Sequence, residues 1–341
     1  MRLTRSPLPA AGRLGRQQGA AVVTALLMVT LAVVIVSGML WRQQVQIRSI
    51  ENQRLVAQAA WIERAAVDWS RLILRDSQRR SPNVDFLGQP WSVPLAETRL
   101  SDFLGVGVST SEGGETSFVS GRILDAQARF NLTNLYSWQA DASGVGRMPL
   151  MNQTGLFAFK RLLQTLGLNA GLAEQTAQYF VRAAWGIPVN GQPVPRPPDS
   201  VQDLLAIPGY TPAIVATLEP FVTILPEATQ VNANTADAEV LAAVIENLPL
   251  DRARELVRQR DRAYFNNTGD VTNQLKGIAP QASVGDAIDV RTHYFLIYGL
   301  VRHERARRLK VSLVQRLSVF GSGNTTRVIW VRDADAMPEQ R

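Results

Sequence analysis

The chain has 341 residues, of which 46% are hydrophobic and 19% charged, and it contains no Cys and two His. This composition provides ample material for a hydrophobic core and is too apolar for a disordered protein. The absence of Cys excludes disulfides, thiolate metal sites and Cys nucleophiles. The formal net charge of +7 is concentrated at the N-terminus, because residues 1–50 carry six Arg and no acidic residue.

A segment without any charge runs from Ala20 to Trp41. Its 22 residues would form a helix of about 33 Å, which is enough to cross a bilayer. Four Arg precede it, so the positive-inside rule places residues 1–19 in the cytoplasm and the rest outside it. The alternative is a signal peptide cleaved near Val36-Ser37-Gly38. Signal peptides usually have a shorter apolar region of about 7–15 residues, which favours the anchor.

The apolar segment continues into a long predicted stem helix. No Gly or Pro lies between Gly38 and Pro82, and apolar residues recur three to five positions apart. We expect one helix from about Ala20 to about Gln78, roughly 90 Å long. A sheet of four strands would cover only about 20 Å of it. The uncovered part, with Val45, Ile50 and Leu55, is therefore predicted to contact the stem helices of other subunits.

The residues before the anchor resemble a prepilin leader. Arg16-Gln17-Gln18-Gly19 precedes the long apolar helix, and a prepilin peptidase would cleave between Gly19 and Ala20. Most pilins carry Glu at the fifth mature position, which is Thr24 in this chain. The lack of that Glu is typical of the minor pseudopilin K family of type II secretion systems. Thr24 can bond to its own helix backbone and offers no ion pair to a neighbour.

A second resemblance to this family follows a predicted strand at Phe118–Leu124. Asp125 precedes Phe130-Asn131-Leu132-Thr133-Asn134-Leu135, and the family signature has an acidic residue before Phe-Asn-Leu-Asn-Asn-Leu. Thr133 is the one departure. The residues alone predict a turn whose Asn side chains cap a helix start, and we favour this structural role over a residue-specific function.

Helical spacing dominates the next 150 residues. Leu156–Leu166 and Leu172–Trp185 are predicted helices, and a helix beginning at Asp199-Ser200 leads through Ile207–Pro212 into another that ends near Leu218. This pair looks like a helix-hairpin-helix unit. Val231–Ala236 resembles the opening of a second unit, with Asn234 or Thr235 as the N-cap. Both patterns recur in the pseudopilin K family.

Strands return at Tyr294–Val301, Leu309–Leu317 and Val328–Val331. The predicted fold class is α+β, a pilin-like fold (a long N-terminal helix plus an antiparallel sheet) with a large inserted all-α domain that contains helix-hairpin-helix-like units. The predicted ranges are a cytoplasmic leader at 1–19, a transmembrane part at 20–41, pilin-domain parts at 42–129 and 290–332, the insert at 130–289 and a disordered tail at 333–341.

The sequence argues against two other classes of function. A membrane-anchored helix-hairpin-helix receptor would bind nucleic acid, but Asp199–Leu250 carries seven acidic residues and no Lys or Arg. An envelope hydrolase lacks support because the chain has no Gly-x-Ser-x-Gly, no His-Glu-x-x-His and no phosphate loop. His293 and His303 both fall in or beside the terminal strands and are expected to be structural.

The resemblance implies a non-enzymatic role in assembly. A family member would initiate or cap the tip of a short periplasmic pseudopilus and promote protein export. Its partners would be other minor pseudopilins, the prepilin peptidase, the inner-membrane secretion platform and the lipid bilayer, with no nucleic acid. The resemblance also implies that Ca²⁺ is bound structurally. No ligand set is identified, because Asn266–Asp270 and Asp333–Asp335 are predicted to be a turn and a frayed terminus.

Overall fold

The structure is a computed structural model that describes residues 18–104, 117–140, 146–188, 193–304, 306–319 and 323–338. The chain divides into two compact units, Met1–Gln58 and Ala59–Arg341. Helix α1 (Gln18–Arg80) belongs to both, because the division falls within it. Residues 1–17 of the predicted leader lie outside the described residues.

α1 has 63 residues, and its bounds agree with the predicted stem helix within two residues at each end. The cause is the absence of Gly and Pro after Gly38. The helix stops two residues before Pro82, whose ring disfavours helical geometry in the preceding residue. Arg79 and Arg80 lie in the last turn, where their positive charges interact favourably with the negative end of the helix dipole.

The second unit is built on a five-stranded antiparallel sheet with the order β1-β2-β9-β10-β11. Its strands are β1 (Leu95–Arg99), β2 (Ser117–Asp125), β9 (Tyr294–His303), β10 (Ala306–Val319) and β11 (Gly323–Asp333). The expectation of four strands is wrong by one. The missed strand, β1, is a short edge strand of sequence Leu-Ala-Glu-Thr-Arg, which has no clear alternation.

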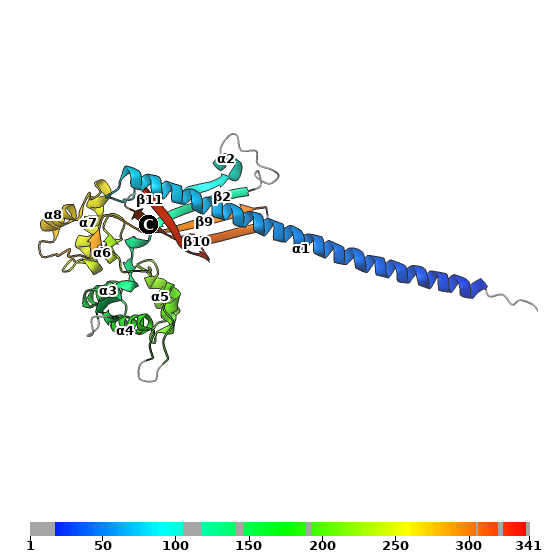
Figure 1. Ribbon diagram of the computed structural model, residues 1–341, viewed down its shortest axis with the longest axis horizontal. Coiled ribbons are helices and arrows are strands. Elements are labelled where there is room, and N and C mark those ends of the chain that lie inside the picture. The colour runs from blue at the N-terminus through cyan, green and yellow to red at the C-terminus, as the bar shows by residue number, and fades with distance from the viewer. Residues whose placement is uncertain are drawn as a thin grey trace, which may run out of the picture. The chain divides into compact units, whose positions relative to one another are not determined.

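Both faces of the sheet are covered. The part of α1 from Ala59 onward packs on one face, where Leu74 meets Ile123, Phe295, Ile297 and Val314; Figure 1 shows this part of α1 lying along the strands. On the other face Leu296, Val311 and Leu313 pack with Leu225 of the insert. Each face of the sheet therefore contributes to a core.

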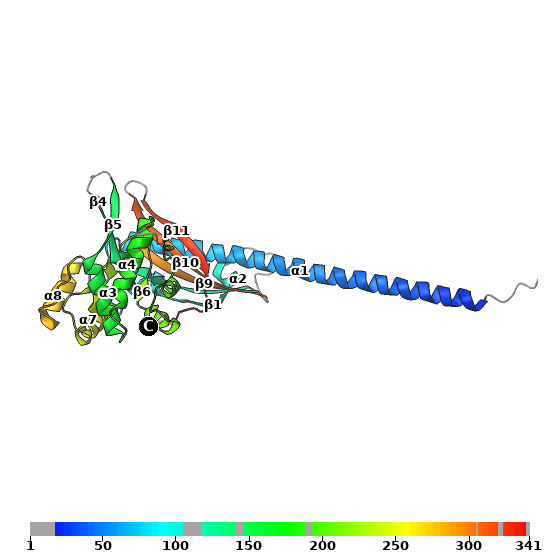
Figure 2. The same cartoon turned by 90° about the horizontal axis from the view of Figure 1, so that it is seen from below.

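The insert lies between β2 and β9 and has its own core. The sheet stops at Asp125 and resumes at Tyr294, an interval that contains the predicted insert at 130–289. Figure 2 shows its helices gathered at one end of the sheet. In order, the elements outside the sheet are η1 (Pro90–Ser92) and α2 (Leu100–Leu104) before the insert, then η2 (Ala126–Ala128), β3 (Phe130–Asn131), η3 (Leu132–Leu135), β4 (Tyr136–Ala140), β5 (Arg147–Met151), α3 (Gln153–Thr165), α4 (Leu172–Trp185), η4 (Val201–Ala206), α5 (Pro212–Leu218), β6 (Val222–Thr223), β7 (Val231–Asn232), α6 (Ala238–Val244), α7 (Leu250–Arg262), α8 (Thr268–Ile278) and β8 (Ile288–Asp289).

The prediction of an all-α insert is wrong, because the insert also contains three two-stranded sheets. β3 pairs with β6 and β7 with β8 in parallel, and β4 pairs with β5 as an antiparallel hairpin. Two of the three pairs involve strands of two residues. Such short pairings join segments far apart in the sequence and leave no local pattern.

The predicted disordered tail is wrong for residues 333–338. Asp333 is the last residue of β11, and the Ala334 N–H donates to the carbonyl of Leu309 at 3.1 Å. The Arg122 guanidinium donates to the carbonyl of Pro338. The C-terminal segment therefore lies on the sheet face opposite α1 as far as Pro338, and residues 339–341 lie outside the described part.

Candidate assembly site

The first unit offers an apolar helical surface. Every residue of α1 from Ala20 to Arg54 is exposed, and α1 is the one helix in the described residues that is long and apolar enough to span a membrane. The helix continues through Val36-Ser37-Gly38, the segment considered as a signal cleavage site. A helix with this composition and no protein around it suits a lipid environment.

Thr24 sits in this surface with its hydroxyl already bonded. Its Oγ1 lies 3.0 Å from the carbonyl oxygens of both Ala20 and Ala21, to one of which the hydroxyl donates. This is the backbone bond expected from the sequence. An uncharged, internally bonded side chain costs little in lipid, whereas a carboxylate there would need a cationic partner. Gly19 and Ala20, the predicted cleavage pair, both lie in the first turn of α1.

The three predicted interface residues do not form one surface. Val45 and Ile50 are 53% and 65% exposed, but Leu55 is only 8% exposed. A spacing of five residues also rotates each one by about 140° from the last around a helix. Leu55 is therefore left out of the surface proposed below.

A different apolar stripe is exposed on the second unit. Trp61 is 71% exposed, Trp69 and Leu72 are each 48% exposed, and Ala65 lies between them. Their spacing of four, four and three residues places them on one side of α1. We call Trp61, Ala65, Trp69 and Leu72 the outer stripe. Apolar spacing in the sequence indicates that these residues share one side of α1, but it does not indicate whether the sheet covers that side.

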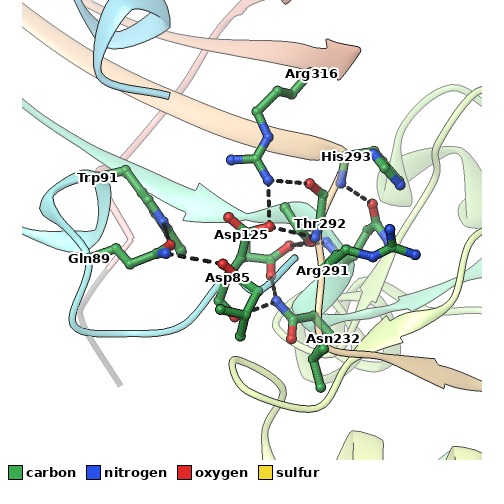
Figure 3. Close-up of polar contacts among 12 residues, drawn as sticks. Asp85, Gln89, Trp91, Asp125, Asn232, Arg291, Thr292, His293 and Arg316 are labelled. Carbon is green, nitrogen blue, oxygen red and sulfur yellow. Dashed lines mark hydrogen bonds and ion pairs between the residues drawn. The ribbon is translucent and has the colours of Figure 1, made fainter. Parts of the chain in front are cut away.

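Where the chain leaves the sheet for the insert and returns, it forms a buried polar cluster, which we call the junction (Figure 3). Asp125, at the end of β2, accepts hydrogen bonds from Thr235 Oγ1 at 2.6 Å, Asn232 Nδ2 at 2.9 Å and the Gln127 N–H at 2.7 Å, and also from the Thr292 hydroxyl. Burial raises the pKa of Asp125 to about 6, and the neighbouring Asp85 adds to the rise, while the side-chain hydrogen bonds oppose it.

Asp85 supplies the second carboxylate of the junction. It follows α1 and is 1% exposed. Its Oδ2 accepts the Thr292 N–H at 2.9 Å and forms an ion pair with Arg316 of β10. Its backbone N–H donates to the carbonyl of Val290 at 2.8 Å. The end of α1, the sheet and the insert are therefore joined through one set of polar contacts.

The Asn side chains of the two segments that resemble the family, Phe130–Leu135 and Val231–Ala236, hold loops in place and do not face solvent. Asn131 caps η3, as predicted, and also bonds to the backbone of Leu225 and Glu227. Asn134 exchanges two bonds with the backbone of Thr229, at 2.7 and 2.9 Å. Asn234 does the same with Phe265, at 2.9 and 2.8 Å. An amide side chain can replace a peptide group in this way, because it carries both a donor and an acceptor.

The predicted N-cap of the second helical unit is wrong. α6 begins at Ala238, and Asp237 occupies the N-cap. Asn234 and Thr235 are instead committed to Phe265 and Asp125. The first helix-hairpin-helix-like unit, which includes η4 and α5, agrees better with its prediction. Ser200 and Asp203 form a capping box, and Gly209 takes a positive φ of 90° in the turn before α5.

The two oxygen-rich segments, Asn266–Asp270 and Asp333–Asp335, form local structural contacts. Asn267 caps α8 by accepting the Asp270 N–H, and Asp270 in turn accepts the Asn266 N–H. Asp333 forms an ion pair with Lys310 at 2.6 Å. Within the described ranges no three His, Asp or Glu side chains gather as a metal site. The structure therefore identifies no ligand set for the ion that the resemblance implies.

The two His residues, discussed above for a hydrolase, and the buried Arg260 all have structural hydrogen-bond partners. His303 is buried with Nδ1 2.7 Å from Ser117 Oγ, and the backbone N–H of His293 donates to Gln127. Arg260 of α7 is 8% exposed and donates to the carbonyls of Ala233 and Ala236.

Comparisons with known proteins agree with this architecture. Two family models, both described as type II secretion system (T2SS), protein K, match residues 128–227 and 231–291. Type II secretion system protein K of Pseudomonas aeruginosa is 29% identical, with 88% of this chain and 89% of that protein covered. Its counterpart in Pectobacterium carotovorum is 28% identical, with 88% and 96% covered.

A solved structure shows the same fold. A chain in the crystal structure of the GspK–GspI–GspJ complex from the enterotoxigenic Escherichia coli type 2 secretion system superposes with a TM-score of 0.61 at 18% identity. The match covers 84% of this chain and 99% of that one. The long helix, the antiparallel sheet and the helical insert are thus shared, and the chain belongs to the type II secretion system protein K family of minor pseudopilins.

Proposed function

We propose that this protein initiates or caps the tip of the periplasmic pseudopilus and acts by assembly rather than by catalysis. The observation that carries the proposal is the outer stripe. Trp61, Trp69 and Leu72 remain exposed on one side of α1, although Leu74 of the same helix is buried in a core with the sheet. Apolar surface of this kind marks a protein interface.

The position of the insert supports placement at a tip. Asp85, five residues beyond α1, is bonded to Val290 and Thr292, which lead from the insert back to the sheet. The insert therefore lies at the end of the sheet where α1 ends. A subunit stacked beyond this one would meet the insert before it could reach the sheet.

Thr24 supports the same role. In a repeating pilin subunit, a Glu at the fifth mature position can pair with the N-terminal ammonium of a neighbour. Thr24 bonds to its own backbone instead, and so it supplies no such pairing. A subunit without that pairing would be a poor repeating unit and a suitable first one.

For partners and topology we extend the same proposal. The related Escherichia coli protein was crystallised with two others, named GspI and GspJ. We expect this chain to bind the two corresponding minor pseudopilins through the outer stripe and through Val45 and Ile50. Residues 1–19 would be cytoplasmic and removed by the prepilin peptidase, the anchor would lie in the inner membrane next to the secretion platform, and the second unit would be periplasmic.

Co-purification tests this proposal. Full-length protein, extracted in detergent from cells that express its two candidate minor pseudopilin partners, should retain both through affinity purification. A major pseudopilin expressed in their place should be retained much less. Equal retention of the major subunit would contradict a specialised tip complex.

A further inference from the structure

The junction contains an unbalanced set of buried charges. Asp85 and Asp125 are 1% and 5% exposed, and the one cation that contacts either of them in the described part of the chain is Arg316, itself 3% exposed. A second buried negative charge with no cation of its own is costly, and protonation is the usual way to remove that cost.

Other charged groups around the junction do not supply the missing cation. Arg291 is engaged with Asp289 at 3.1 Å, and Arg260 with Asp261 and two backbone carbonyls. Arg122 donates to Pro338, and His293 lies beside the junction with an exposed side chain. Asp237 and Arg129 line a surface pocket that Asp125 also lines. The charge of Asp125 is met by neutral donors alone.

The two carboxylates are linked through shared donors. Thr292 gives its N–H to Asp85 and its hydroxyl to Asp125. Asn232 Nδ2 bonds to the carbonyl of Asp85 at 3.2 Å and to Asp125 Oδ2 at 2.9 Å. Yet Asp85 Oδ1 is buried and has no hydrogen-bond donor.

We propose that Asp125, with Asp85 beside it, takes up one proton from solvent on mild acidification and then holds the insert to the sheet more firmly. Arg316 pairs with Asp85. The added proton therefore resides on Asp125, which no cation contacts in the described part of the chain. The hydroxyls of Thr235 and Thr292 can rotate to accept as well as donate, so the protonated acid keeps its partners.

The direction of the pH effect follows from linkage. A folded-state pKa of about 6 lies above the ordinary value of 3.8, so the folded protein binds the proton more tightly than the unfolded chain. The stabilisation is complete below the unfolded value and is lost as the pH rises through about 6. Acidification from about pH 7.5 to about pH 5 should therefore raise the Tm.

Infrared spectroscopy of the full-length protein in detergent tests the proton itself. At about pH 5 the protein should show the C=O stretch of a protonated carboxyl, and this band should disappear with a midpoint near pH 6. Asp125→Asn should remove the band and the rise of the Tm. Asp251→Asn, at an acidic side chain 74% exposed on α7, should change neither.

Two results would overturn the proposal. One is a protonated-carboxyl band that persists unchanged in Asp125→Asn. The other is a midpoint below about pH 4.5 in the wild-type protein, the ordinary range of an exposed carboxyl. The wild-type titration needs no variant, so it decides the question even if Asp125→Asn fails to fold.

Discussion

Single residues of the insert show why short polar motifs can be essential without being catalytic. Asn134 and Asn234 each hold a distant loop with one donated and one accepted bond. The sequence predicted the local cap formed by Asn131, because a cap depends on neighbours two or three positions away. It could not predict the partners of Asn134 and Asn234, which lie 95 and 31 positions away.

Replacing one atom of Asn234 tests this role. In Asn234→Asp the donor to the Phe265 carbonyl becomes an oxygen, so a buried acceptor loses its partner and faces another acceptor. We expect the free energy of unfolding to fall by about 1–3 kcal/mol, measured by urea denaturation. Asn83→Asp, at an exposed position before the junction, should leave it unchanged. Equal stability of the two variants would show that the Asn234 bonds are dispensable.

Processing is decided by another single residue. Gly19→Leu places a bulky side chain at the predicted cleavage position and should abolish removal of the leader. N-terminal sequencing of the membrane-extracted wild-type protein should begin at Ala20. Gly38→Leu is the matched control, because a side chain at Gly38 meets nothing within 4 Å and should not affect cleavage. A wild-type terminus near Met39 would instead mean a secretory signal peptide and a released product.

At the scale of elements, the sequence of α1 predicts where the helix begins and ends but not which of its faces the sheet covers. Its extent follows from the lack of Gly and Pro, but the centre of its covered face does not follow from apolar spacing. The sheet presents polar residues to α1: Arg308 lies 3.3 Å from Glu63, and Arg71 donates to the Thr326 carbonyl. Apolar residues of α1 pack on the sheet beside these polar contacts, among them Val67, Ile73 and Leu74, so the covered face is of mixed character. Trp69, four residues before Ile73, is exposed.

The outer stripe gives the prediction that belongs to this scale. Trp61→Asp should abolish co-purification with the minor pseudopilins, because a carboxylate would be desolvated at the contact. Circular dichroism should be unchanged, since Trp61 is 71% exposed. The matched control is Trp138→Asp on β4 of the insert, where the Trp is 47% exposed. If both variants bind the partners like the wild type, the stripe is not the interface.

At the scale of the whole molecule, the order of elements was predictable and their pairing was not. Strands that resume at Tyr294 after a helical stretch indicate an insertion into one sheet. The pairing of β2 with β9 and the junction around Asp125 bring together residues from Asp85 to Arg316. No local pattern encodes such contacts, and for the same reason the acidic residue before the Asn segment appeared as a motif without a visible role.

Labelling of isolated pseudopili tests most directly whether this protein occupies the tip. The chain has no Cys, so Lys276→Cys on the exposed side of α8 provides a single attachment site for maleimide-gold. Electron microscopy of pseudopili assembled with this variant should show gold at one end of each filament and nowhere else. Gold distributed along the length would contradict the account, because it would mean that the protein is a repeating subunit.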